Sequence, residues 1–170
     1  NRAGELGHIP LDGIPHPCGC GLVGCLETVA SATGIVRTAR DVIEREGRDS
    51  VLRKWFPGDG LPGLTAKDVS RAYDAGDAAA AEVYERVGAW LGKGLAYAVT
   101  LFSPDRVVIG GGAAAAGERL LAPVRRAMER HLIRAYWERI EVVPAVLGDD
   151  AGVVGSAMHG RARALAGGSA

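Results

Sequence analysis

Apolar residues recur at steps of three and four over the segment from Leu26 to Ile43, and this spacing predicts an amphipathic helix. The same spacing, bounded by caps and breaks, returns several times along the chain. It predicts further helices over residues 65–73, 78–102, 117–136 and 149–165. Short apolar runs between these helices predict buried strands over residues 106–109 and 140–146.

Local signals mark the boundaries of these elements. The run T-A-K-D at Thr65–Asp68 is typical of a helix capping box, and Asp77 is placed to cap the long helix that follows. Residues 48–63 contain GRDS and PGDGLPG, which predict a surface loop. We expect Trp55 and Phe56 to attach this loop to the core.

The long predicted helix contains three glycines, Gly88, Gly92 and Gly94. Glycine costs about 1 kcal/mol relative to alanine in a helix interior. These glycines therefore predict that another backbone or a ligand packs closely against the helix.

The order helix, helix, strand, helix, strand, helix indicates an α/β fold with too few strands for a complete sheet. The sequence contains no internal repeat. It begins at Asn1 rather than at a methionine and enters a dense motif at once. We therefore expect the chain to be the C-terminal part of a longer protein.

Composition and charge narrow the class of protein. Apolar residues make up 48% of the 170 residues and charged residues 24%, as in ordinary globular domains. Twenty basic residues balance twenty acidic ones, so this region lacks the basic footprint of a nucleic-acid-binding domain. No apolar run reaches the roughly 18 residues that a membrane span needs, and the N-terminus lacks a signal-peptide layout. These features predict a cytoplasmic protein that has no membrane partner.

Three cysteines lie within eight positions, close to a histidine. The set is His8, Cys18, Cys20 and Cys25, with Gly19, Gly21 and Gly24 between the cysteines. Thiolate and imidazole are the donors that zinc prefers in closed tetrahedral sites, and glycines allow the tight turns that bring the donors together. The segment also has little apolar content, so a metal cross-link would fix its shape. We predict a structural Zn²⁺ site.

The alternatives to this prediction are specific. His16 could supply the imidazole in place of His8, although it lies very close to Cys18. Three free cysteines and an unrelated surface histidine would also produce this pattern. A redox pair is less favoured because one residue, rather than two, separates Cys18 from Cys20.

Two motifs resemble the signature of the ROK family of repressors, open reading frames and sugar kinases. These are G-E-L-G-H at Gly4–His8 and C-G-C-G-L-V-G-C-L-E at Cys18–Glu27. The chain matches every fixed position of the family pattern G-E-x-G-H and C-x-C-G-x-x-G-C-x-E. Ser103–Gly112 and Leu147–Ala157 also resemble later family segments.

The resemblance implies an actin-like, ribonuclease-H-like ATPase fold in which the sugar occupies a cleft between two lobes. It implies that residues 1–27 form a zinc-binding and sugar-contact loop and that residues 28–166 form the C-terminal lobe. The four zinc ligands would be His8, Cys18, Cys20 and Cys25, and Glu5, His8 and Glu27 would contact the sugar. By itself, Glu27 is also a favourable first-turn acid of a helix, and Glu5 is an ordinary loop acid.

The glycine run Gly110–Gly112 follows a predicted strand and precedes a helix, so its amides could approach a nucleotide. Such a turn often needs glycine for steric reasons alone, but in the ROK context Gly111 and Gly112 would line the ATP site. Asp149 and Asp150 are better explained as N-cap and first-turn residues than as Mg²⁺ ligands.

Two parts of a ROK kinase are missing from these 170 residues. They are the D-x-G-x-T phosphate loop and the N-D dipeptide whose Asp acts as general base. We expect both upstream, and we expect this chain alone to be inactive. The parent would be a glucokinase-like enzyme that uses ATP and Mg²⁺ to phosphorylate a hexose 6-hydroxyl.

Two other functions remain open. One is the sugar-sensing domain of a ROK repressor, with a DNA-binding helix-turn-helix upstream. The other is a zinc-stabilised interaction module without a ligand, which the carboxylate pair disfavours. The resemblance also implies a homo-oligomer, a dimer or a tetramer.

Overall fold

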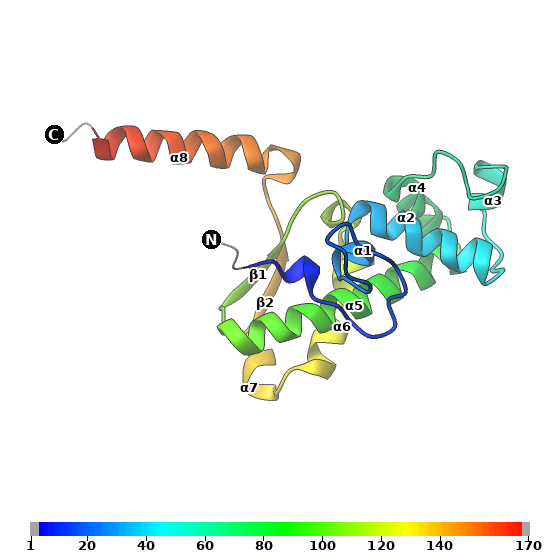
Figure 1. Ribbon diagram of the computed structural model, residues 1–170, viewed down its shortest axis with the longest axis horizontal. Helices are drawn as coiled ribbons and strands as arrows, with labels where there is room; N and C mark the ends of the chain where they lie inside the picture. The colour runs from blue at the N-terminus through cyan, green and yellow to red at the C-terminus, as the bar shows by residue number, and fades with distance from the viewer. Residues whose placement is uncertain (1–3, 168–170) are drawn as a thin grey trace.

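The computed structural model describes residues 4–167 as a mainly helical body from which one long helix projects (Figure 1). The helices are α1 Glu27–Ala30, α2 Ala32–Arg40, α3 Leu52–Trp55, α4 Ala66–Asp74, α5 Ala78–Phe102, α6 Glu118–His131, α7 Arg134–Trp137 and α8 Ala151–Gly167. The strands are β1 Arg106–Ile109 and β2 Glu141–Pro144. Three short 3-10 turns, Leu6–His8, Ala114–Ala116 and Gly148–Asp150, and a π-helical turn, Asp41–Arg45, complete the described elements.

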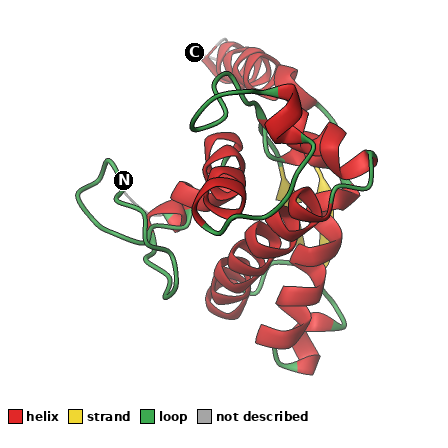
Figure 2. Ribbon diagram, turned by 90° about the vertical axis from the view of Figure 1, so that its right-hand side faces the viewer, coloured by secondary structure: helices red, strands yellow, loops and turns green. Residues whose placement is uncertain are grey.

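The two strands pair in parallel, with Val107 opposite Val142. They form a two-stranded sheet in the described chain, which agrees with the prediction of an α/β fold with an incomplete sheet. Figure 2 shows these short strands among the helices, with the N-terminal loop extending on one side.

Helices α5 and α6 pack so closely that their contact requires glycine. A Cβ added to Gly92 would lie 2.5 Å from the Cβ of Ala127, and one added to Gly88 would lie 2.6 Å from the Cβ of Pro123. A Cβ on Gly94 would lie 2.6 Å from a methyl carbon of Leu26. The close packing that these glycines predicted is confirmed.

Several predicted boundaries are confirmed as well. The Thr65 side chain accepts from the amide of Asp68, and the Asp68 side chain accepts from the amide of Thr65, so the capping box is present. Asp77 accepts from the amide of Ala80 at the start of α5. Trp55 and Phe56 pack against the main core.

The structure corrects other boundaries. The helix predicted from Leu26 to Ile43 is interrupted at Ser31, whose extended backbone and side chain cap α2 instead. The loop predicted over residues 48–63 contains α3. The helix predicted over residues 117–136 ends at His131 and restarts as α7. Apolar spacing continues through the two helix breaks, at Ser31 and after His131, so the pattern alone does not reveal them.

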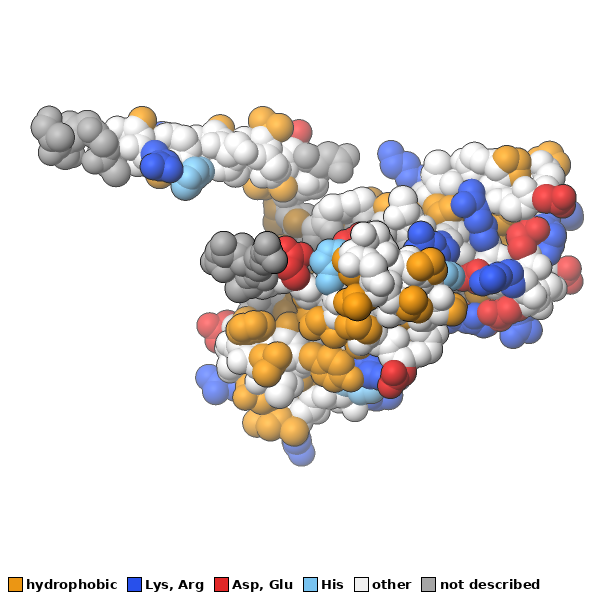
Figure 3. All heavy atoms as spheres, in the orientation of Figure 1, with side chains coloured by type: hydrophobic (Ala, Val, Ile, Leu, Met, Phe, Trp, Pro, Cys, Tyr) orange, Lys and Arg blue, Asp and Glu red, His pale blue; other side chains and the backbone are white. Residues whose placement is uncertain are grey.

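Helix α8 extends away from the body, and the side chains described on it are exposed, including Val153, Met158 and Leu165 (Figures 1 and 3). Apolar side chains also gather at the C-terminal end of α5, where Leu101 and Phe102 are about three-quarters exposed. The 3-10 turn Gly148–Asp150 leads directly into α8, which begins at Ala151 and not at Asp149 as predicted. No helix in the described part is both long enough and apolar enough to cross a bilayer.

Candidate metal and sugar-binding site

The N-terminal loop folds back on itself through two antiparallel bridges, Pro10 with Cys25 and Pro17 with Val23. The Cys18 amide donates to the Leu22 carbonyl at 2.8 Å, which closes a tight turn that contains Cys20. Gly24 has a positive φ of 88°, and a Cβ there would lie 3.2 Å from the Ile14 carbonyl oxygen. Glycine at this position therefore lets Cys25 follow the turn closely.

This fold brings the four predicted metal ligands together. One ligand atom from each of His8, Cys18, Cys20 and Cys25 lies within 4.8 Å of all the others. The Cys20 and Cys25 sulfurs are 3.5 Å apart, and the Cys18 sulfur is 3.6 Å from His8 Nδ1. In tetrahedral zinc sites with sulfur bonds near 2.3 Å, ligand sulfurs lie about 3.8 Å apart. The residues present therefore fit a zinc ion in donor type, number and spacing.

The surroundings of the three thiols differ. A backbone amide hydrogen bond from Leu22 lowers the pKa of Cys20, whereas burial, together with the Cys20 hydrogen bond, raises the pKa of Cys25 to about 12. The Cys25 thiol thus keeps its proton at neutral pH unless a cation displaces it. A bound metal would release that proton, which makes metal affinity fall as the pH falls.

His16 is engaged elsewhere. Its Nε2 lies 2.8 Å from an Asp41 carboxylate oxygen, and its side chain is 10% exposed. His16 is not a member of the ligand cluster. The structure therefore favours His8 over His16 as the imidazole donor, and the contact between His16 and Asp41 joins the N-terminal loop to the π-helical turn.

The loop also contains a small core that sequence reasoning missed. Leu11 and Ile14 are buried with Leu26 and Val29, against Trp90 of α5. The apolar residues of this loop are few and have no helical or strand period, so no periodic signal could reveal the cluster. Apolar packing as well as a metal can therefore hold the loop in place.

His8 uses its two ring nitrogens in different directions. Nδ1 faces Cys18, whereas Nε2 lies 3.9 Å from a Glu5 carboxylate oxygen and 4.0 Å from one of Glu27. The Cys18 hydrogen bond, together with the negative charges of Cys18, Glu27 and Glu5, raises the pKa of His8. Both carboxylates are more than half exposed. The three predicted sugar-contact residues thus lie side by side at the surface, next to the ligand cluster.

The glycine run lies at the end of β1, as predicted. Gly111 has a positive φ of 76°, and a Cβ on Gly112 would lie 3.2 Å from the Cβ of Ala32. Gly112 borders a cavity of about 170 Å³ that Lys67 and Ser70 also line. Gly111 has open space beside it, whereas Gly112 lies close to α2, so close packing by itself explains a glycine at position 112. Contact of these two glycines with a nucleotide stays a prediction.

Solved structures identify the class to which this fold and site belong. The chain superposes on a ROK glucokinase of Streptomyces griseus, solved with glucose and AMPPNP, with a TM-score of 0.76 and 37% identity over 90% of this chain and 49% of that one. A ROK transcriptional regulator, a homologue of the Escherichia coli MLC protein, gives a TM-score of 0.71 and 30% identity over 84% of this chain and 34% of that one. Over the part that it spans, the chain has the actin-like ATPase fold of the ROK sugar kinases.

The family follows from the sequence match. The model of the ROK family matches residues 1–162, and the chain belongs to this family.

Curated relatives include both kinases and regulators. The chain is 43% identical to the glucokinase of Halalkalibacterium halodurans over 156 residues, which are 90% of this chain and 46% of that protein. It is 38% identical to the glucokinase of Streptomyces coelicolor, over 91% of this chain and 49% of that protein. It is 32% identical to the transcriptional regulator NagC of Escherichia coli, over 86% of this chain and 34% of that protein. The chain thus spans about half the length of the glucokinases that it matches.

Proposed function

We propose that this chain is the zinc- and sugar-binding half of a glucokinase-like ROK sugar kinase that transfers a phosphoryl group from ATP to a hexose 6-hydroxyl. The glucokinases at 43% and 38% identity support the sugar kinase class. Within the chain, residues 1–27 would form the zinc and sugar loop, and residues 28–166 would form the C-terminal lobe.

The observation that carries the proposal is the orientation of His8. With Nδ1 directed at Cys18 and Nε2 directed at Glu5 and Glu27, one imidazole can bind a metal and a sugar hydroxyl at once. A metal on Nδ1 leaves the proton on Nε2, so Nε2 becomes a fixed hydrogen-bond donor. The two carboxylates accept hydrogen bonds from neighbouring sugar hydroxyls. Together, His8 and the two carboxylates would orient the sugar ring without taking part in the phosphoryl transfer.

Zinc would have a structural role at this site. Cys18, Cys20, Cys25 and His8 would complete its coordination, which leaves no open position for a substrate or a water. The ion would hold the tight turn around Cys20 and fix the ring of His8. Sugar affinity should therefore depend on zinc even though the metal does not touch the sugar.

The nucleotide would lie toward Gly111 and Gly112. The structure of the Streptomyces griseus glucokinase with AMPPNP supports an ATP site in this class of protein. Mg²⁺ would accompany ATP, as phosphoryl transfer generally requires. The general base and the phosphate loop would come from the part of the protein that precedes Asn1.

The test measures zinc content and glucose affinity on the same purified chains. We expect one zinc ion per wild-type chain, and loss of the metal in Cys20→Ser and in His8→Gln. The matched control, His131→Gln on α6, keeps its zinc. If the wild-type chain is purified in the presence of zinc and still contains none, the proposal of a zinc site is contradicted.

Glucose binding, followed by calorimetry, separates the sugar contacts from the metal. Glu27→Gln should keep its zinc and weaken glucose binding by about 10-fold or more, because a charge-assisted hydrogen bond contributes about 1.5–3 kcal/mol. Glu129→Gln on α6 should bind glucose as the wild type does. Equal glucose affinity in Glu27→Gln and the wild type would remove this carboxylate from the proposed site.

A sugar-sensing repressor is the second candidate, which the 32% identity to NagC favours. The same zinc and sugar residues would serve an effector site in that case. The sequence that precedes Asn1 in the parent protein separates the two functions. D-x-G-x-T with an N-D base indicates a kinase, and a winged-helix segment indicates a repressor.

A further inference from the structure

A groove of about 460 Å³ lies between α2 and the start of α4. The proposed zinc ligands and sugar-contact residues do not line it. Its volume is within the range of about 300–1,000 Å³ that is usual for small-molecule sites. We propose that this groove binds a small phosphate monoester, with the phosphate group on Arg37 and Arg40. Such a site would suit a kinase or a repressor alike, so it does not depend on the proposed kinase function.

The two arginines share one face of α2. They are three positions apart, a spacing that places side chains next to each other on a helix, and both line the groove. Arg37 Nη1 donates to the Thr28 carbonyl at 2.9 Å, and Arg40 Nη2 lies 3.4 Å from the Leu61 carbonyl oxygen. These carbonyls orient the guanidinium groups but do not neutralise their charge. Each group also keeps other N–H donors for a ligand.

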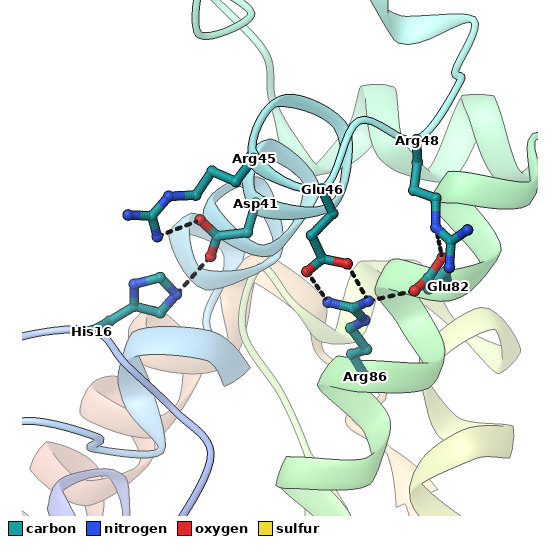
Figure 4. A network of polar contacts seen from close by, with 7 residues as sticks. All are labelled: His16, Asp41, Arg45, Glu46, Arg48, Glu82 and Arg86. Carbon is teal, nitrogen blue, oxygen red and sulfur yellow. Dashed lines mark hydrogen bonds and ion pairs between the residues drawn. The ribbon is translucent and has the colours of Figure 1, made fainter.

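Arg37 and Arg40 lack the carboxylate partners that arginines close to them have. In the described chain, neither guanidinium group has a carboxylate oxygen within 4.0 Å. Each arginine in the polar contacts of Figure 4 does have such a partner: Arg45 contacts Asp41, Arg48 contacts Glu82, and Arg86 contacts Glu46 and Glu82. An anion can therefore reach Arg37 and Arg40 without displacing a carboxylate.

The surrounding backbone has the same sign of charge. Helices α2 and α4 begin at Ala32 and Ala66, and both of these residues line the groove. The first amides of a helix lack acceptors within it, so this end carries a partial positive charge. The acid in the first turn of α4, Asp68, is engaged in the capping box with Thr65. The helix starts thus add to the field of the two arginines.

The rest of the groove favours an ester over a free inorganic ion. Val36 and Leu64 line it, and Leu64 is 6% exposed. Guanidinium groups bind phosphate oxygens through paired N–H donors, and the organic part of an ester can cover the apolar wall. Inorganic phosphate uses the first of these contacts alone. We therefore expect a monoester to bind more tightly than inorganic phosphate.

A sugar and a nucleoside are two sources of such a phosphate group. A Cβ on Gly112 would lie 3.2 Å from the Cβ of Ala32, so the groove is next to the glycine run. The probes are therefore glucose 6-phosphate and AMP, each compared with its unphosphorylated counterpart, glucose or adenosine. Tighter binding of one probe identifies the source, and saturable binding of either supports the site.

The experiment follows the arginine Nε–H signals of the isotope-labelled chain by NMR. We expect at least one monoester to shift the signals of Arg37 and Arg40 saturably, with a Kd on the order of 1 mM. Glucose and adenosine should leave these two signals unchanged. Spectra of Arg37→Gln and Arg40→Gln assign the signals.

The same variants test the two side chains. Arg40→Gln changes an exposed residue and should weaken monoester binding about tenfold or more, as should Arg37→Gln. Both should keep zinc and the glucose affinity of the wild type, which separates this groove from the proposed sugar site. Arg130→Gln removes the same charge from an exposed position on α6 and should bind the monoester normally.

Three results would overturn the proposal. The first is the absence of a saturable shift with either monoester up to about 10 mM. The second is wild-type monoester affinity in Arg40→Gln together with a folded Arg37→Gln, or with Arg40→Gln alone if thermal unfolding shows that Arg37→Gln does not fold. The third is an equal loss of affinity in Arg130→Gln, which would show attraction to the overall charge of the chain rather than to the groove.

Discussion

At the residue scale, His8 and His16 show how position within a fold gives one side chain its role. Both belong to the same loop and both face a carboxylate, but only His8 also faces a cysteine sulfur. His16 Nε2 contacts the Asp41 carboxylate at 2.8 Å, and this contact joins the loop to the helical body. The difference follows from the turn at Cys18–Cys25, which brings the three sulfurs close to His8 but not to His16.

The ion pair between Asp74 and Arg119 has a measurable pH signature. Arg119 Nε donates to Asp74 at 2.8 Å, and this hydrogen bond lowers the pKa of Asp74 below its ordinary value. A carboxylate whose pKa is lower in the folded state stabilises the fold above its unfolded pKa and loses that effect as the pH falls through the folded pKa. We therefore expect Asp74→Asn to lower the thermal midpoint slightly at pH 7.

The same variant should match the wild type at pH values well below 3.8, the ordinary pKa of this carboxyl. Thermal unfolding across this pH range measures the difference. Asp59→Asn, at an exposed loop position without an ion pair in the described chain, is the control and should show no pH-dependent gap. A gap for Asp74→Asn that stays constant down to acid pH would contradict the assignment.

At the element scale, the contact between α5 and α6 depends on small residues. A Cβ on Gly92 would lie 2.6 Å from the Val124 carbonyl oxygen as well as 2.5 Å from the Ala127 Cβ, so the α6 backbone would have to move.

We expect Gly92→Ala to destabilise the chain by about 1–3 kcal/mol, because overpacking outweighs the gain of about 1 kcal/mol in helix propensity. Urea unfolding measures the free energy. The control is Gly152→Ala in α8, where a new Cβ meets nothing within 4 Å. This control should be neutral or stabilising by up to about 1 kcal/mol. If both variants changed stability equally, close packing at Gly92 would be excluded as the cause.

At the scale of the whole molecule, the body leaves apolar surface uncovered. Leu101 is 73% exposed and Phe102 is 74% exposed at the end of α5, beside Tyr97 at 41%. Exposed apolar patches on soluble domains commonly mark contact surfaces. The oligomeric state of the parent protein remains a prediction.

For the isolated chain we expect concentration-dependent self-association through this patch. Leu101→Lys with Phe102→Lys should shift the chain toward the monomer in sedimentation experiments. Ala75→Lys, at the exposed C-terminus of α4, adds the same kind of charge elsewhere and should leave the association unchanged. Association that persists in the Leu101 and Phe102 variant would place the contact on another face.

The sequence by itself determined the features that depend on neighbours along the chain. Local sequence patterns predict the helix caps at Thr65 and Asp77 and the bounds of α5. The spacing of the three cysteines is also local, because a short turn is enough to bring their sulfurs together. The family motif added His8 to this set before any geometry was known.

Only the tertiary structure decided what depends on residues far apart in sequence. The pair His16–Asp41, the unpaired hydroxyl of Thr38 and the break at Ser31 have no periodic signal. The His16–Asp41 contact arises because the N-terminal loop lies against the π-helical turn, 25 positions further along the chain. Apolar spacing predicts which face of an element is buried, but it does not predict which element covers that face.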